Sequence, residues 1–182
     1  MHDMTAGNLR SAHGGESMAH MRYLVWGEKA AKDGFPKVAR LFRAIAHAER
    51  VHAWNHFAEL RDEAGAHLVP STAGFGLGTT SRNLEGAIEG EMFEVEEMYP
   101  AYLDTAKSQK ERGAQLSFHY ALSAERIHAA MYQKAKQAVD GGADLELGPV
   151  QICEVCGYTA EGEAPDKCPI CTATREQFRA FA

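Results

Sequence analysis

The chain has 182 residues, of which 45% are hydrophobic and 24% are charged. These fractions are those of a globular protein and exclude wholesale disorder. No run approaches the roughly 18 apolar residues of a membrane-spanning helix, and the net charge of −6 argues against nucleic acid as the main partner. The first residues lack the basic and then apolar pattern of a signal peptide, so we expect a cytoplasmic protein. Nine histidines and four cysteines remain to be explained, because both residue types bind metals.

The first part of the chain, residues 5 to about 139, has apolar residues three and four positions apart, which is the pattern of helices. Breaks fall at Gly34–Pro36, in the Pro- and Gly-containing segment 63–81, and at Gly113. The middle break is long enough to be a crossover connection instead of a tight turn. We therefore expect an all-α four-helix bundle over residues 1–140, with its helices paired two and two.

The third expected helix, residues 81–112, contains Pro100. Proline removes one backbone hydrogen bond and clashes with the carbonyl group four residues earlier. The sequence therefore predicts a kink near Glu96.

A second, smaller unit follows the bundle. Residues 140–144, Asp-Gly-Gly-Ala-Asp, are typical of a flexible hinge, and we place a linker at 141–148. Residues 149–182 contain all four cysteines. This segment is shorter than the roughly 40 residues below which a chain usually needs a metal or disulfides to fold. We therefore expect a metal-stapled domain over 149–182.

An internal repeat lies in the helical part. Residues 48–53, Ala-Glu-Arg-Val-His-Ala, recur as 124–129, Ala-Glu-Arg-Ile-His-Ala. A Gly-Glu pair precedes each copy at a similar distance, at Glu16 and at Glu91. Each half of the bundle thus has a lone glutamate on one helix and Glu-x-x-His on the next, which suggests a duplicated helical hairpin.

Residues three positions apart share a helix face, so Glu49 projects with His52, Glu125 with His128, and Glu91 with Glu94. If these faces meet inside the bundle together with Glu16, the carboxylates need cations to compensate their charge. One glutamate from each of two helices plus Glu-x-x-His from the other two is the donor set of ferritin-like di-iron bundles. The alternative, solvated helix faces, suits one Glu-x-x-His but is disfavoured by two copies with small or apolar neighbours.

The four cysteines form two Cys-x-x-Cys pairs, Cys153 with Cys156 and Cys168 with Cys171. Paired motifs of this kind place four thiolates tetrahedrally around one ion. Disulfides are the alternative, and the absence of a secretory pattern disfavours them. The spacing fits iron, as in rubredoxin, and also zinc.

With both donor sets in view, the chain resembles rubrerythrins over nearly its whole length. The matching strings are Gly15-Glu16-Ser17, Ala48 to Ala53, Gly90-Glu91-Met92-Phe93-Glu94, Glu97 to Pro100, Ala124 to His128, Cys153-x-x-Cys156-Gly157-Tyr158 and Cys168-Pro169-x-Cys171. The resemblance implies a ferritin-like bundle with two iron ions, followed by a rubredoxin-like domain with one iron. Thr172 departs from free-standing rubredoxins, which usually have glycine after the last cysteine.

The resemblance also implies roles for individual residues. Glu49 and Glu125 would bridge the two irons; Glu16 would be a terminal ligand of one iron, and Glu91 with His128 of the other. In the family, the first iron exchanges a glutamate for a histidine on reduction, which corresponds to Glu94 and His52 here. Tyr23 and Tyr99 would hydrogen-bond the ligand carboxylates. His56, one turn after His52, is expected to be a buried, hydrogen-bonded histidine.

The function that the resemblance implies is a non-haem di-iron peroxidase. It would reduce hydrogen peroxide to water in oxidative-stress defence, with electrons relayed through the four-cysteine iron. The expected donor is a rubredoxin or an NAD(P)H-dependent reductase. We also expect a head-to-tail homodimer, in case the small domain cannot reach its own bundle, and the long crossover would permit helix swapping. The alternatives are a ferroxidase or iron-handling protein of the ferritin-like class, and a non-catalytic module with zinc in both sites.

Overall fold

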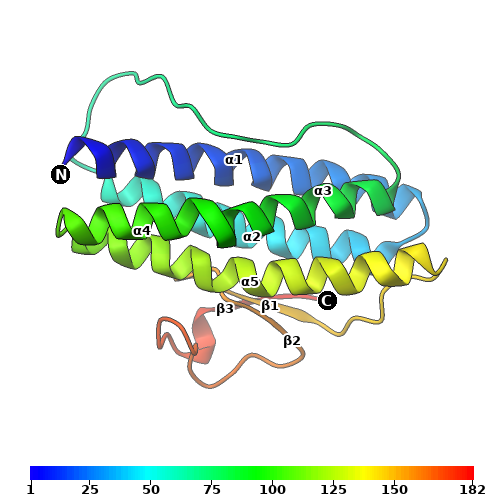
Figure 1. Ribbon diagram of the computed structural model, residues 1–182. Helices are drawn as coiled ribbons and strands as arrows, with labels where there is room; N and C mark the ends of the chain where they lie inside the picture. Colours follow the sequence, from blue (N-terminus) through cyan, green and yellow to red (C-terminus); the bar gives the residue numbers. More distant parts are fainter.

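The computed structural model describes all 182 residues and contains four long rods of helix (Figure 1). The elements are α1 (Asp3–Lys32), α2 (Pro36–Glu59), α3 (Thr80–Phe93), a π-helical turn (Glu94–Met98), α4 (Tyr99–Ser108) and α5 (Arg112–Asp140). The π-helical turn joins α3 to α4, so these three elements form one interrupted rod. The expected four-helix bundle is confirmed. No helix is long and apolar enough to cross a membrane.

The irregularity expected near Glu96 takes the form of the π-helical turn. Tyr99 N–H donates to the carbonyl of Glu94, five residues earlier. Pro100, the next residue, has no N–H to donate, so the regular pattern cannot simply continue through it. The altered turn lies in the middle of the bundle, where Glu94 begins it.

The crossover between α2 and α3 runs along the outside of the bundle, beside α1 (Figure 1). Its hydrogen bonds to the helices include those from Arg10 to Glu63, from Ser11 to the carbonyl of Pro70, and from Trp26 Nε1 to the carbonyl of Gly76. Leu68 and Phe75 on this segment are almost fully exposed. The expected long crossover is therefore present, and it covers one side of the bundle only loosely.

Two apolar clusters fill the bundle. The larger cluster includes Tyr23, Phe42 and Tyr132, whereas the smaller one includes Tyr99 and Phe118. Buried side chains of α1 recur every three or four residues, as the period of a helix packed on one face requires. The carboxylates and histidines of the repeat belong to neither apolar cluster, although they are buried.

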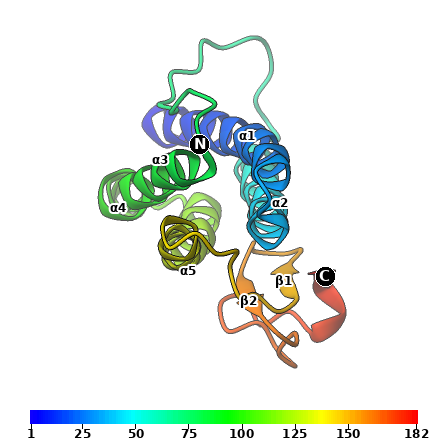
Figure 2. The same cartoon turned by 90° about the vertical axis from the view of Figure 1, so that its right-hand side faces the viewer.

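The small domain has a three-stranded antiparallel sheet in the order β2-β1-β3. Its elements are β1 (Val150–Cys153), β2 (Thr159–Glu161), a 3₁₀ turn (Arg175–Gln177) and β3 (Phe178–Phe181). Viewed along the bundle, the domain lies beneath α2 and α5 (Figure 2). It contacts both of these helices, which are also the two that contain Glu-x-x-His.

The segment expected to be a flexible hinge is instead attached to the bundle. Both carboxylate oxygens of Asp144 accept hydrogen bonds from the first turn of α2, at Lys37 N and Val38 N. Leu145 and Leu147 are buried and belong to the larger apolar cluster. The two domains therefore share one continuous core, and the linker fixes their relative position.

Candidate metal centres

Two groups of buried donors meet between the helices. The first consists of Glu16, Glu49, His52 and Glu125, and the second of Glu49, Glu91, Glu125 and His128. In each group one donor atom per residue lies within 4.8 Å of all the others. Glu49 and Glu125 belong to both groups, and each carboxylate has two oxygens to offer. The geometry is that of two adjacent cation sites with two shared carboxylates.

The two Glu-x-x-His motifs contact each other as well as themselves. His52 Nδ1 lies 2.9 Å from Glu49 Oε2 and 2.8 Å from Glu125 Oε1. His128 Nδ1 lies 2.6 Å from Glu125 Oε2 and 3.3 Å from Glu49 Oε1. Each histidine thus faces its own glutamate, on the same helix face, and the glutamate of the other motif. The sequence repeat appears in space as a nearly symmetric pair of half-sites.

Several oxygens of this cluster are buried without a hydrogen bond. They are Glu16 Oε2, Glu49 Oε1, Glu91 Oε2 and Glu125 Oε1. Glu125 Oε1 lies near His52 Nδ1, but that nitrogen already has Glu49 Oε2 as its hydrogen-bond partner. An unsatisfied buried polar group costs about 1–3 kcal/mol, and more when it is charged. Four such oxygens around two adjacent positions fit two divalent or trivalent cations, for which carboxylate and imidazole are suitable ligands. The donor set therefore fits a di-iron site.

The pKa values of the cluster agree with this interpretation. Burial, then the charges of neighbouring glutamates, raises the pKa of Glu16 and of Glu91 well above the usual range. Burial opposes protonation of His52 and His128, but the charge of Glu125 is chief among the interactions that raise both pKa values well above normal. The metal-free cluster thus holds protons, which bound cations would displace.

Glu94 is the predicted ligand that the structure leaves outside both groups. It is only half-buried and lines a cavity beneath the crossover. Burial and then the charge of Glu16 raise the pKa of Glu94 well above its usual range. Six of the seven predicted carboxylates and histidines are therefore together, with Glu94 at the rim and His52 in the first group.

Both predicted tyrosines contact a ligand candidate. Tyr23 OH donates to Glu91 Oε1 at 2.7 Å, and Tyr99 OH donates to Glu16 Oε1. His56 extends the second contact, since its Nε2 lies 3.0 Å from Tyr99 OH and its Nδ1 lies 2.8 Å from Ser117 Oγ. Burial lowers the pKa of His56 to about 3. His56 is thus a neutral, buried, hydrogen-bonded histidine, as expected.

The four cysteines form one compact group without disulfides. The Sγ atoms of Cys153 and Cys171 are 3.6 Å apart, and those of Cys156 and Cys168 are 3.5 Å apart. A hydrogen bond from Cys156 is the main cause that lowers the pKa of Cys153 to about 5, whereas burial raises the pKa of Cys171 to about 11. A bound metal would stabilise all four sulfur atoms as thiolates. The expected four-cysteine knuckle site is confirmed.

The two knuckle turns match each other. Gly157 N–H donates to the carbonyl of Cys153, and Thr172 N–H donates to that of Cys168. Both residues have positive φ, 78° at Gly157 and 64° at Thr172. A β-branched residue rarely adopts this conformation. Thr172 nevertheless has the backbone conformation that suits the glycine usually found at this position in free-standing rubredoxins.

The small domain closes directly over both histidines of the bundle. His128 Nε2 lies 2.8 Å from Thr159 Oγ1, which donates to the carbonyl of Gly157 at 3.1 Å. A Cβ atom at Gly157 would lie only 2.1 Å from His52 Nε2. Sequence reasoning missed both contacts, although Gly157 directly follows Cys156.

This contact bears on the expected dimer. A head-to-tail pair is expected when the small domain cannot reach its own bundle. In the structure the domain reaches its own bundle through Thr159 and Gly157. The dimer therefore stays a prediction, without that argument for it.

Taken together, these features define a ferritin-like di-iron protein with a fused rubredoxin-like domain. The rubrerythrin family model matches residues 7–136, and the model described as "Rubrerythrin, rubredoxin-like domain" matches residues 151–179. The chain belongs to the rubrerythrin family. It contains a di-iron carboxylate–histidine site and a rubredoxin-like four-cysteine site.

Individual relatives are similar in sequence to this chain over almost its whole length. Rubrerythrin-2 of Clostridium acetobutylicum is 49% identical over 178 residues, which is 98% of this chain and 97% of the relative. Nigerythrin of Nitratidesulfovibrio vulgaris is 32% identical over 97% of this chain and 86% of its own length. A solved structure of fully reduced, all-ferrous nigerythrin superposes with a TM-score of 0.85 at 32% identity, with the same coverage.

A more distant neighbour supports the fold alone. Bacterioferritin of Rhodobacter capsulatus superposes with a TM-score of 0.68 at 19% identity, over 78% of this chain and 88% of that chain.

Proposed function

We propose that this protein is a peroxidase that reduces hydrogen peroxide to water at the di-iron site. One observation carries the proposal: two donor groups share Glu49 and Glu125, and their histidines touch the small domain that contains the four cysteines. Iron bound there would supply two electrons and Lewis acidity toward the O–O bond. A storage protein has no evident use for the second metal domain.

Each side chain of the cluster has a role in this proposal. Glu49 and Glu125 would bridge the two irons, because each belongs to both groups. Glu16 would be the terminal carboxylate of one iron. Glu91 and His128 would be the terminal ligands of the other.

Tyr99 and Tyr23 would orient the terminal carboxylates through the hydrogen bonds that they donate to Glu16 and Glu91. His56 supports Tyr99, because the Tyr99 proton points to Glu16 and Tyr99 then accepts a hydrogen bond from His56 Nε2. The neutral state of His56 leaves the negative charge of the cluster for the metals.

Glu94 and His52 would alternate as ligands of the first iron. A hard carboxylate favours ferric iron and a neutral imidazole better suits ferrous iron, so Glu94 would bind after oxidation and His52 after reduction. The proposal is supported by the positions of the two residues, since His52 belongs to the first donor group and Glu94 lies outside it, in the lining of the adjacent cavity.

An iron ion held by the four cysteines would pass electrons one at a time to the di-iron site in the bundle. Gly157 and Thr159, which follow Cys156 in the chain, touch His52 and His128. This contact supports relay within one chain. A rubredoxin or an NAD(P)H-dependent reductase would supply the electrons, and peroxide would be the oxidant.

The test is peroxide consumption by iron-loaded protein with a rubredoxin and its NAD(P)H-dependent reductase. Metal analysis and the red colour of a ferric tetrathiolate accompany the assay, because zinc would leave the protein colourless. Turnover of NAD(P)H with peroxide is the expected result. Iron oxidation without peroxide turnover would favour the ferroxidase alternative, and two colourless zinc sites would favour the non-catalytic one.

The ligand exchange has its own test. Glu94→Ala is expected to lower turnover strongly and to change the spectrum of the oxidised di-iron site, while the four-cysteine absorption stays the same. Glu97→Ala is the matched control, because Glu97 is an exposed acid on the same π-helical turn. Unchanged turnover in Glu94→Ala would refute the exchange.

A further inference from the structure

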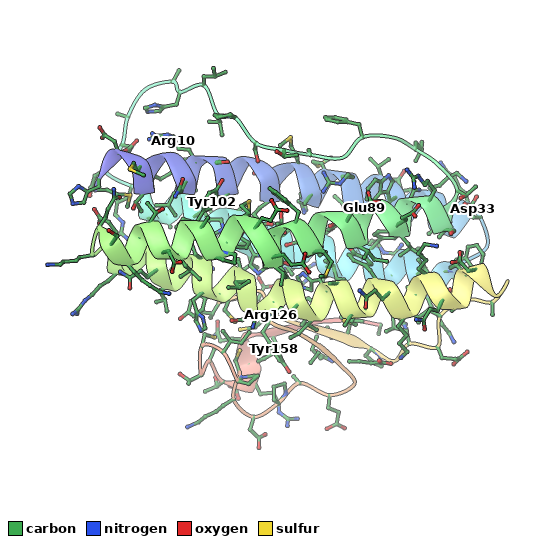
Figure 3. All side chains as sticks on the ribbon, viewed as in Figure 1. Arg10, Asp33, Glu89, Tyr102, Arg126 and Tyr158 are labelled. Carbon is green, nitrogen blue, oxygen red and sulfur yellow. The ribbon has the colours of Figure 1, made fainter.

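A cavity of about 610 Å³ lies between α1, α3 and the crossover. Its walls include the apolar side chains of Trp26, Leu77 and Phe93 and the polar side chains of Arg22 and Glu94. The crossover passes along this side of the bundle (Figure 1). Figure 3 labels Glu89, another lining residue, on α3. The cavity is thus a mixed apolar and polar chamber beneath a loosely held segment.

This chamber lies next to the di-iron site. Gly15 and Gly90 line it, and each directly precedes a ligand candidate, Glu16 or Glu91. A Cβ atom at Gly90 would lie 3.8 Å from both Tyr23 OH and Arg22 Nη2. The missing side chain of Gly90 therefore leaves space next to the tyrosine that orients Glu91.

The chamber is much larger than hydrogen peroxide needs. A water molecule occupies about 30 Å³ in the liquid, and peroxide has only one more heavy atom. Pockets for organic ligands typically measure about 300–1,000 Å³, a range that includes this cavity. Size therefore points to a substrate with a carbon skeleton.

Polar groups line the chamber beside Tyr23, the tyrosine that contacts Glu91. Arg22 Nε is buried and has no hydrogen-bond partner, while its guanidinium lies 5.4 Å from the ring centres of Tyr23 and Trp26. A guanidinium offers donors to oxygen. The carboxyl group of Glu94 also lines the chamber. An apolar wall and an oxygen-binding end are what a small amphiphilic oxidant requires.

We propose that the di-iron site also reduces small organic hydroperoxides, which enter through this chamber. The carbon group packs against Trp26 and Phe93, and the hydroperoxide oxygens face Arg22 and Glu94. The O–O bond breaks while two electrons and two protons are taken up, which yields one alcohol and one water. The electrons come from the reduced carrier that the proposed peroxidase function already requires, so the inference rests on that function.

Binding is tested without turnover, on full-length protein loaded with redox-inactive zinc. Cumyl alcohol, the product of cumene hydroperoxide, is the probe, and Trp26 fluorescence is the signal. The second tryptophan, Trp54, is 68% exposed and is removed by Trp54→Phe. A saturable change in Trp26 emission is expected. No saturable change would overturn the inference.

Gly90→Leu narrows the chamber beside Tyr23 and is expected to weaken cumyl alcohol binding at least about tenfold, the effect of a misfit methylene or more in a shaped pocket. Gly7→Leu is the matched control, because it is also a helix glycine and nothing lies within 4 Å of its Cβ position. Phe93→Ala serves as a second variant, should Gly90→Leu fold poorly, and weaker binding is expected there too. Unchanged binding in both chamber variants would overturn the inference.

The activity assay separates this inference from the proposed function. Iron-loaded protein is expected to consume both hydrogen peroxide and cumene hydroperoxide, and Phe93→Ala to lose mainly the second activity. Consumption of hydrogen peroxide alone would refute the organic substrate and leave the peroxidase intact. Consumption of neither would refute the peroxidase itself, while the zinc-protein binding result still decides whether the chamber holds an organic molecule.

Discussion

His128 Nε2 lies 2.8 Å from Thr159 Oγ1, so one hydrogen bond joins a ligand candidate of the bundle to the small domain. Figure 3 labels two residues close to them in the chain: Arg126 on α5, two residues before His128, and Tyr158 on the small domain, directly before Thr159. Because Thr159 Oγ1 donates its own proton to the carbonyl of Gly157, it accepts a hydrogen bond from His128 Nε2–H, and this leaves Nδ1, which faces Glu125 and Glu49, as the nitrogen that can bind a metal. Thr159 thereby fixes the tautomer and ring orientation of His128.

Thr159→Val keeps the shape of the side chain but removes the acceptor. A buried N–H without a partner costs about 1–3 kcal/mol, and loss of such a support typically costs about 10–100-fold in metal affinity. We expect one of the two bundle metals to become easier to remove by a chelator, with the four-cysteine metal unaffected. Thr159→Ser, which restores the hydroxyl, is expected to recover most of the affinity. Equal metal retention in Thr159→Val and the original chain would contradict this role.

Gly157→Ala tests the close approach of the two domains. The added Cβ would lie 2.1 Å from His52 Nε2, so the small domain must move away from the bundle. Gly162→Ala is the control, because Gly162 also has positive φ, 92°, but nothing lies within 4 Å of its Cβ position. Both variants pay a backbone cost of about 1–2 kcal/mol.

Only Gly157→Ala is expected to slow electron transfer from the four-cysteine iron to the bundle, measured by stopped-flow after reduction of the small domain. It is also expected to lower the free energy of unfolding more than Gly162→Ala does. Equal transfer rates in the two variants would mean that the contact has no part in the relay.

The sequence was sufficient to predict the metal-binding core because local spacing determines it. Three-residue spacing on a helix puts Glu49 with His52 and Glu125 with His128 on common faces, and two-residue loops bring paired cysteines together. The duplication then showed that these faces belong to one site. Such patterns survive without knowledge of the tertiary arrangement.

The contacts between domains were not predictable in the same way. Thr159 and Gly157 lie in a loop and a short strand whose neighbours are set by docking, and no local period reveals that docking. The linker did carry a signal, since Leu145 and Leu147 alternate with polar residues as a packed extended segment does. The preceding glycines favoured a hinge interpretation instead. Pro100 predicted an irregularity near Glu96, but nothing in the sequence indicated that it would be a π-helical turn beginning at Glu94.

Asp144 provides a test of the anchored linker. Its carboxylate accepts from Lys37 N and Val38 N at the start of α2, where unpaired N–H groups and the helix dipole favour a negative charge. Asp144→Ala is expected to cost about 1 kcal/mol of stability and to increase proteolysis of the 141–148 segment. Asp144→Asn, which keeps an acceptor, is expected to lose less. Proteolysis as slow as in the original chain would contradict the anchoring.

When the metals are removed, protons bind to the buried cluster in their place. Glu16 and Glu91 have raised pKa values because of burial and neighbouring carboxylates. Those of His52 and His128 are also raised, since the charge of Glu125 and other contacts outweigh burial. Between about pH 5 and 8 the folded metal-free chain therefore binds more protons than the unfolded chain. A raised folded-state pKa contributes stability below the unfolded pKa and loses it as pH rises through the folded one.

The metal-free protein is accordingly expected to become less stable as pH rises from about 5 to 8, by up to about 1.4 kcal/mol per pH unit for each extra proton. Thermal unfolding at several pH values measures this slope. Metal-loaded protein is expected to show a much weaker slope, because bound cations have already displaced the protons. Glu16→Gln should flatten the slope of the metal-free chain, since it removes one proton-binding carboxyl. A metal-free chain that gains stability with rising pH would show that the cluster does not hold these protons.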